Sequence, residues 1–306
     1  MPLVQANGLQ IQIEEHGQPT DPAVLLIMGL ATQLVHWPPV MIESLVKAGY
    51  RVITFDNRDI GLSERLEGMR SPSPATMLMG RAIRLGWLLA PYDLSDMADD
   101  TIGILDALEL DEAHLLGVSM GGMIGQIVSA KHPGRIRSFT SIMSTTNNPA
   151  LPKTKPEILR AIIKARSRRR TPEDQVEQSM ALLQMIGSPD GDRDDVALRE
   201  LVASSVARCN YPAGVRRQIA AIVASGDLRR WTEQISVPTL VMHGRVDPLT
   251  PYQGSVDMSS LIPGSRLEVI DGMGHDLPPR YIGRINELIA NHITAVENGG
   301  DSSRAA

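Results

Sequence analysis

Apolar and polar side chains alternate over residues 9–15, as they do in a strand with one buried face. Residues 23–28, in contrast, are apolar without interruption, which is typical of a strand that is covered on both faces. Similar short runs recur at residues 51–55, 113–117, 138–143, 238–242 and 266–270. These doubly covered strands predict the interior of a parallel sheet.

Helical periodicity occupies most of the intervals between these strands, for example residues 94–108, 123–131 and 281–296. Strands that alternate with helices form βαβ units, whose helices pack on both faces of the sheet. We therefore predict an α/β fold with an open, mostly parallel central sheet.

The alternation of strands and helices stops between residues 147 and 225. Helical segments follow one another there, at residues 157–170, 173–186, 194–208 and 213–224, and prolines separate them. We interpret residues 147–225 as a helical cap inserted between two parts of the core, residues 1–146 and 226–297.

A second insertion is predicted at residues 65–92, between a strand and the next helix. It contains the largely apolar residues 77–89, which are too few to span a bilayer. A lid helix over a pocket is our interpretation, and an anchor on a membrane surface is the alternative. The last residues, 298–306, are small and polar and are predicted to be disordered.

Composition excludes several classes of partner. The formal net charge of the 306 residues is −5, and no long basic run is present, which argues against nucleic acid. Cys209 is the only cysteine, so no intrachain disulfide can form. Residues 1–18 lack the pattern of a signal peptide, and no run of about 18 apolar residues occurs. We expect a cytoplasmic protein without stable membrane insertion.

The strongest chemical signal is Gly117-Val118-Ser119-Met120-Gly121-Gly122, which follows an apolar run and opens a helix. This is the context of a nucleophile elbow, a tight turn that projects a serine Oγ above the sheet. Gly117 and Gly121 flank the serine, where a Cβ atom would obstruct the close approach of backbone segments. Ser119 is therefore the candidate nucleophile.

Two further groups follow in the chain order that this architecture uses, first an acid and then a histidine. Asp247 lies in the loop after the run at 238–242, and His275 lies in the loop after the run at 266–270. Parallel strands deliver both loops to the edge where Ser119 is expected. We predict that His275 takes the proton of Ser119 and that Asp247 orients the imidazole.

The neighbouring titratable residues have simpler interpretations. His243 could bind a metal, but no second histidine stands at a ligand spacing, and we expect neither metal nor organic cofactor. His292 falls within a helical pattern. Asp271 and Asp276 are too close in sequence to His275 to orient it and are expected to cap a turn, and Asp56 is expected to hold its own turn together.

The negative charge that develops on the carbonyl oxygen of an ester during attack needs hydrogen-bond donors. The backbone N–H groups of Leu30 and Met120 are our candidates for an oxyanion hole, and Gly29 is expected to permit the turn before Leu30. The alternative is that residues 28–33 form no more than a glycine turn.

Together these motifs resemble the α/β-hydrolase superfamily from about residue 9 to residue 292, and within it the aclacinomycin methylesterase type of esterase. The likeness rests on four stretches: Met28-Gly29-Leu30 with Trp37-Pro38, residues 55–63 (FDNRDIGLS), residues 119–123 (SMGGM) and residues 272–278 (GMGHDLP). Many superfamily members have His-Gly where this chain has Met28-Gly29, a departure that leaves a backbone donor unaffected. The resemblance implies Ser119, Asp247 and His275 as a catalytic triad.

The predicted function is hydrolysis of a carboxylic ester, a small or medium acyl ester or a methyl ester, through an acyl-enzyme on Ser119. A small-molecule ester is thus the expected partner. The same triad also serves lactonases, C–C bond hydrolases and perhydrolases, and the sequence does not separate them from an esterase. A non-catalytic ligand receptor built on a hydrolase scaffold is the alternative from another class.

Overall fold

The computed structural model describes residues 2–70, 72–73, 76, 90–164 and 171–304. In this part of the chain, eight strands form one sheet in the order β1-β2-β4-β3-β5-β6-β7-β8. They are β1 (Leu3–Ala6), β2 (Leu9–His16), β3 (Ala23–Ile27), β4 (Arg51–Phe55), β5 (Ala113–Val118), β6 (Ile136–Ile142), β7 (Thr239–Gly244) and β8 (Arg266–Ile270). The pairs β1/β2 and β2/β4 are antiparallel and all others are parallel. The predicted fold class is confirmed.

Helices occupy the connections. They are α1 (Pro39–Lys47), α3 (Leu94–Ala107), α4 (Met120–Lys131), α5 (Pro156–Lys164), α6 (Pro172–Ile186), α7 (Asp195–Arg208), α8 (Pro212–Ser225), α9 (Arg229–Thr232), α10 (Gln253–Leu261) and α11 (Pro279–Arg304), with 3-10 turns at Leu34–His36 and Pro133–Arg135. The periodicity of the sequence locates α3, α4 and α11 but does not single out α1, α10 or the edge strand β1.

The uninterrupted apolar strands supply two separate cores. In β3, Leu25 and Ile27 pack toward α3 and α4, whereas Val24 and Leu26 pack toward α1 and α11. All four side chains are fully buried. Because successive side chains of a strand point to opposite faces, only a strand without polar positions can serve both cores.

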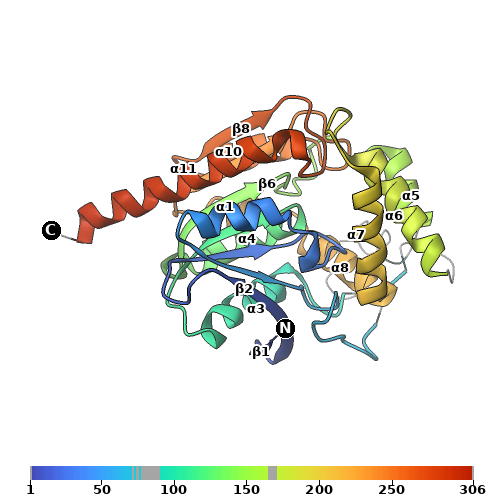
Figure 1. The fold of residues 1–306 in the computed structure, drawn as a ribbon, viewed down its shortest axis with the longest axis horizontal. Coiled ribbons are helices and arrows are strands. Elements are labelled where there is room, and N and C mark those ends of the chain that lie inside the picture. The colour runs from blue at the N-terminus through green and yellow to red at the C-terminus, as the bar shows by residue number, and fades with distance from the viewer. Residues whose placement is uncertain (1, 71, 74–75, 77–89, 165–170, 305–306) are drawn as a thin grey trace.

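Helices α5 to α8 lie between β6 and β7 in the chain. In Figure 1, α5, α6 and α7 stand together at the right of the molecule, beyond the ends of the strands. Val176, Met180 and Val202 form a small apolar cluster of their own between α6 and α7. These helices occupy the segment that the sequence assigns to a cap. The predicted lid helix at residues 77–89 lies outside the described residues.

The end of the chain differs from the expectation of a disordered tail after residue 297. Helix α11 continues to Arg304, and Figure 1 shows its last turns extending away from the sheet. No proline follows Pro279, so every later residue retains the N–H that continues the helical hydrogen bonds. The helices in the described part of the chain all lack a stretch of the length and apolar character that spanning a bilayer requires.

His114 connects β5 to α11. Its side chain is 1% exposed, with Nδ1 at 2.7 Å from Ser138 Oγ and Nε2 at 2.8 Å from Glu297 Oε1. Burial, together with the positive charge of Arg137, lowers the pKa of His114 to about 3. The native protein therefore holds this histidine neutral at pH values where the unfolded chain protonates it.

We predict that this difference reduces stability in mild acid. The unfolded chain takes up a proton below a pH of about 6.5, whereas folded His114 does not until about pH 3, so the free energy of unfolding falls through this window. His114→Gln removes the effect. The stability advantage of the wild type over this variant should shrink by about 1 kcal/mol between pH 7.5 and 5.5, measured by urea unfolding. An advantage that does not change with pH would contradict the prediction.

Candidate active site

Ser119 lies at the turn between β5 and α4, with backbone angles φ 54° and ψ −117°. A positive φ is uncommon for a residue with a Cβ atom and costs about 1–3 kcal/mol. The Ser119 N–H still donates to the carbonyl oxygen of Ile142 at 2.9 Å, while its carbonyl oxygen accepts from the N–H groups of Gly122 and Met123. Strand therefore changes to helix at a single residue.

The two predicted turn glycines allow this change by close backbone contact. A Cβ atom on Gly117 would lie 2.3 Å from the carbonyl oxygen of Gly121. A Cβ atom on Gly121 would lie 2.1 Å from the carbonyl oxygen of Ile27, at the end of β3. Both distances are well inside van der Waals contact, so any other residue at either position would push the turn away from the sheet.

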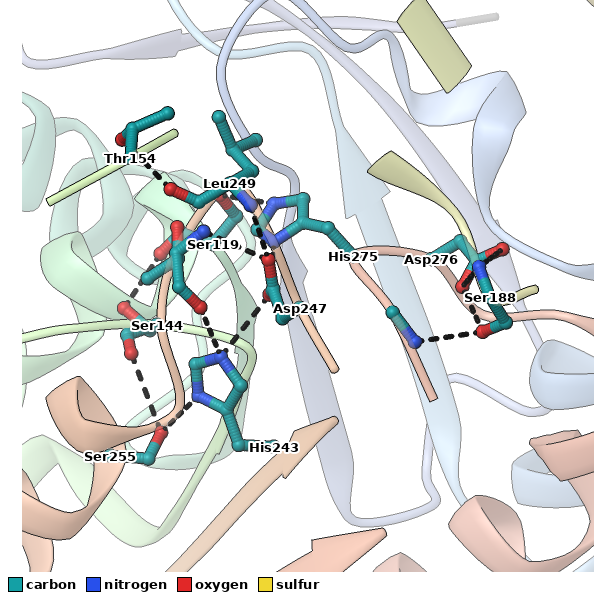
Figure 2. A network of polar contacts seen from close by, with 12 residues as sticks. Ser119, Ser144, Thr154, Ser188, His243, Asp247, Leu249, Ser255, His275 and Asp276 are labelled. Atoms are coloured by element: carbon teal, nitrogen blue, oxygen red, sulfur yellow. Dashed lines mark hydrogen bonds and ion pairs between the residues drawn. The ribbon is translucent and has the colours of Figure 1, made fainter. Parts of the chain in front are cut away.

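The structure brings Ser119, His275 and Asp247 together (Figure 2). His275 Nε2 is 3.0 Å from Ser119 Oγ, and His275 Nδ1 is 2.6 Å from Asp247 Oδ2. Ser119 follows β5, Asp247 follows β7 and His275 is in the loop after β8, and these strands are parallel members of one sheet. Their carboxyl ends therefore share one edge, which places side chains from three distant segments within hydrogen-bond reach.

Asp247 is a buried carboxylate with a full set of donors. Its Oδ1 accepts from the N–H groups of Leu249 and Thr250, at 2.9 and 2.8 Å. Burial alone would raise its pKa, but the charge of His275 and hydrogen bonds from His243 and His275 lower the pKa to about 2. An ionised Asp247 keeps the imidazole proton on Nδ1, so that Nε2 is free to accept the Ser119 hydroxyl.

His243 is fully buried behind Asp247. Its Nε2 lies 2.8 Å from the Thr250 carbonyl oxygen and 3.2 Å from Asp247 Oδ2, and its Nδ1 lies 2.6 Å from Ser255 Oγ. Because a carbonyl oxygen can only accept, Nε2 carries a proton that it shares with Asp247. From the sequence, His243 is considered only as a metal ligand, and its contact with Asp247 is not predicted. The one local feature that could have indicated this contact is the short spacing between the two residues.

The loop of His275 is held by the end of α6. The His275 N–H donates to the carbonyl oxygen of Ile186 at 2.8 Å. The Asp276 carboxylate accepts from the Ser188 N–H at 3.0 Å and from its hydroxyl at 2.5 Å, and Ser188 Oγ accepts from the Gly274 N–H (Figure 2). Asp276 therefore joins two distant segments of the chain, and its carboxylate accepts from a backbone N–H just after the end of α6.

The loop after β3 lies against Ser119. A Cβ atom on Gly29 would stand 3.2 Å from the Cβ atom of Ser119. Leu30 follows directly, and Met120 is the first residue of α4, where N–H groups have no acceptor within the helix. Leu30 and Met120 thus flank Ser119 in the chain segments that meet there, and their role as oxyanion donors remains a prediction.

Other residues singled out in the sequence lie apart from the chemistry. Asp56 is fully buried and accepts from the N–H groups of Leu34 and Leu62, which fits its expected structural role. Asp271 forms an exposed ion pair with Arg245. In the described parts of the chain, no group of three or more His, Cys, Asp or Glu residues is arranged to hold a metal ion.

The chain is similar to known proteins over most of its length. A family model for the alpha/beta hydrolase fold matches residues 22–278. Rhodomycin D methylesterase DnrP of Streptomyces peucetius is 27% identical over 298 residues, which cover 90% of this chain and 92% of that protein. 3-Oxoadipate enol-lactonase 1 of Acinetobacter baylyi is 24% identical over 274 residues, which cover 88% of each.

Solved structures share the architecture. The enol-lactonase from Burkholderia xenovorans LB400 superposes with a TM-score of 0.74 at 21% identity, over 96% of this chain and all of that chain (100%). The meta-cleavage product hydrolase from Pseudomonas fluorescens IP01 gives a TM-score of 0.73 at 20% identity, over 96% and 98% of the two chains. At these identities the likeness concerns the fold.

The close contact at Gly121 generates a test of the turn. Gly121→Ala should lower the free energy of unfolding by about 2 kcal/mol or more, because the new methyl group meets the Ile27 carbonyl oxygen. Gly134→Ala is the matched control, since nothing lies within 4 Å of a Cβ atom there. Its effect should stay within about 1 kcal/mol of the wild type in urea unfolding. Equal losses in the two variants would contradict the contact.

Proposed function

Because the chain belongs to the α/β-hydrolase family, we propose that it is a serine hydrolase that cleaves a carboxylic ester through an acyl-enzyme on Ser119. The observation that carries the proposal is the chain of contacts from Ser119 Oγ to His275 Nε2, at 3.0 Å, and from His275 Nδ1 to Asp247 Oδ2, at 2.6 Å. This arrangement of hydroxyl, imidazole and buried carboxylate is what a serine needs to become a nucleophile at neutral pH.

In the first half of the proposed reaction, Ser119 Oγ attacks the carbonyl carbon of the ester while its proton passes to His275 Nε2. The ionised Asp247 stabilises the imidazolium that results. When the tetrahedral intermediate collapses, the C–O bond to the alcohol breaks and His275 returns the proton to the departing oxygen. The acyl group remains on Ser119.

Water completes the cycle by the same steps. His275 removes a proton from water, the oxygen attacks the acyl carbon, and the proton returns to Ser119 Oγ as the acid departs. In both tetrahedral intermediates the negative oxygen needs donors, which we assign to the N–H groups of Leu30 and Met120. Helix α4 begins at Met120, so its dipole favours negative charge at the same place.

The substrate class is proposed from the relatives. One relative is a methylesterase that aligns with this chain over 92% of its own length. It supports a methyl ester, or a small or medium acyl ester, as the substrate. A lactonase is the second candidate, because an enol-lactonase is 24% identical over 88% of this chain. A lactone is a cyclic ester, so the steps are unchanged except that the alcohol stays attached to the acyl group.

Removal of the nucleophile tests the proposal. The wild type should hydrolyse p-nitrophenyl esters of graded acyl length and release methanol from methyl esters, and Ser119→Ala should lose this activity by at least about 10³-fold. A fluorophosphonate should add one adduct to the wild type and none to Ser119→Ala, as measured by intact mass. Comparison of kcat/KM for methyl esters and for lactones separates the two candidate substrates.

The opposite outcome has a clear meaning. A folded wild type that is inert toward esters, lactones and the fluorophosphonate would contradict the proposed hydrolase. Retained affinity for an ester without turnover would then favour a ligand receptor on this scaffold.

The acid is tested by a change that retains its shape. Asp247→Asn should lower kcat by about 10⁴-fold, because an amide no longer holds the imidazole proton on Nδ1. Far-UV circular dichroism should show that the variant is folded, and steady-state kinetics measure the loss. A decrease of less than about tenfold would remove Asp247 from the proposed triad.

A further inference from the structure

Gln218 of α8 reaches from the helical segment into the core. Its side chain is fully buried, and its two polar atoms are both engaged. Oε1 accepts from the Ala31 N–H at 3.1 Å, and Nε2 donates to the Arg58 carbonyl oxygen at 3.0 Å. A residue 187 positions away in the chain thus holds the loop that follows β3.

That loop needs an external support. Ala31 has φ 62°, which is unfavourable for a residue with a Cβ atom, and its N–H is saturated by Gln218. Within the loop, the Thr32 N–H donates to the Gly29 carbonyl oxygen and Thr32 Oγ1 donates to the Leu30 carbonyl oxygen. The peptide that carries the Leu30 N–H therefore lies between Gly29, which abuts Ser119, and Ala31, which Gln218 fixes.

The segment that provides Gln218 is itself fixed to the core. The neighbouring Arg217 is 1% exposed and pairs with the buried Asp59 at 2.6 Å, and Arg208 at the end of α7 pairs with the buried Asp56 at 2.6 Å. Gln33, the last residue of the loop, donates to the carbonyl oxygen of Ser205 at 2.7 Å. Helices α7 and α8 are thus fastened to the loop after β3 and to the loop after β4.

We propose that Gln218 is a positioning residue that fixes the peptide of Leu30 beside Ser119, so that helix α8 is part of the support of the oxyanion hole. This inference rests on the proposed function, because an oxyanion hole has a purpose only if Ser119 is acylated. Oxyanion donors act within a narrow range of about 2.7–3.1 Å from the developing charge. A shift of the loop by about 1 Å removes most of the benefit without changing the nucleophile.

The test compares two buried glutamines. Gln218→Met keeps the length of the side chain and removes both hydrogen bonds. Gln12→Met is the matched control, because Gln12 of β2 is 2% exposed and its Nε2 donates to the carbonyl oxygens of Pro2 and Ile13, neither of which belongs to the loops that meet at Ser119. Thermal unfolding should show a similar decrease of Tm in both variants.

Kinetics separate a positioning role from a loss of stability. Gln218→Met should lower kcat by about 10- to 100-fold with KM within about threefold of the wild type, whereas Gln12→Met should leave both constants near the wild type. The affinity for an alkyl boronic acid, which forms a tetrahedral adduct on a reactive serine, should fall in parallel with kcat. A structural role alone would not weaken the tetrahedral adduct more than the substrate.

A second variant covers the case in which Gln218→Met does not fold. Gln218→Glu retains an acceptor for the Ala31 N–H. Its kcat should be lower than that of the wild type and, where Gln218→Met folds, higher than that of Gln218→Met. If the kcat and boronate affinity of the Gln218 variants match those of Gln12→Met, the proposal is overturned. If the wild type shows no hydrolysis that depends on Ser119, the proposed function fails and this inference fails with it.

Discussion

The contact between the turn at Ser119 and the end of β3 is the constraint on which the rest of the site depends. Gly117 and Gly121 let three backbone segments approach where any Cβ atom would lie about 2 Å from a carbonyl oxygen. At this approach Ser119 has a positive φ, and α4 starts directly after it. The strain at one residue is sustained because strand, helix and neighbouring loop all fix the same turn.

The loops that carry Asp247 and His275 complete the site because each is fastened to a second segment. The acid loop is tied to the start of the helical segment, where Thr154 Oγ1 donates to the carbonyl oxygen of Leu249 (Figure 2). The loop of His275 is tied through Asp276 to Ser188. A His–Asp contact of 2.6 Å therefore depends on several hydrogen bonds that do not touch the serine. Such supporting contacts keep catalytic groups within the narrow geometry that proton transfer requires.

Buried charge fixes the place of the helices beside the sheet. Asp56 and Asp59 are fully buried near the end of β4, and arginines from α7 and α8 neutralise them. A buried ion pair contributes little net stability compared with an apolar pair, but removal of one partner leaves an uncompensated charge at a cost of about 3–5 kcal/mol. Misplacement of α7 and α8 would have the same consequence, so these pairs favour one arrangement of the helices over others.

The sequence by itself determined the fold class, the chain order of Ser119, Asp247 and His275, and the glycines around Ser119. These features depend on local patterns. Apolar runs mark strands that are covered on both faces, and the turn around Ser119 is recognised from a few consecutive residues. The expected positions of the strands agree with the structure to within a few residues, since burial on both faces leaves a continuous apolar run.

Only the tertiary structure decided which polar side chains support the site. His243 behind Asp247, Ser188 under Asp276 and Gln218 against Ala31 are contacts across as many as 187 residues. Glutamine, serine and histidine occur in many ordinary positions, and their hydrogen-bond partners are set by how loops and helices pack. A single sequence carries the periodicity of each element but not the distance between two elements, which is fixed only when the whole chain closes around its cores.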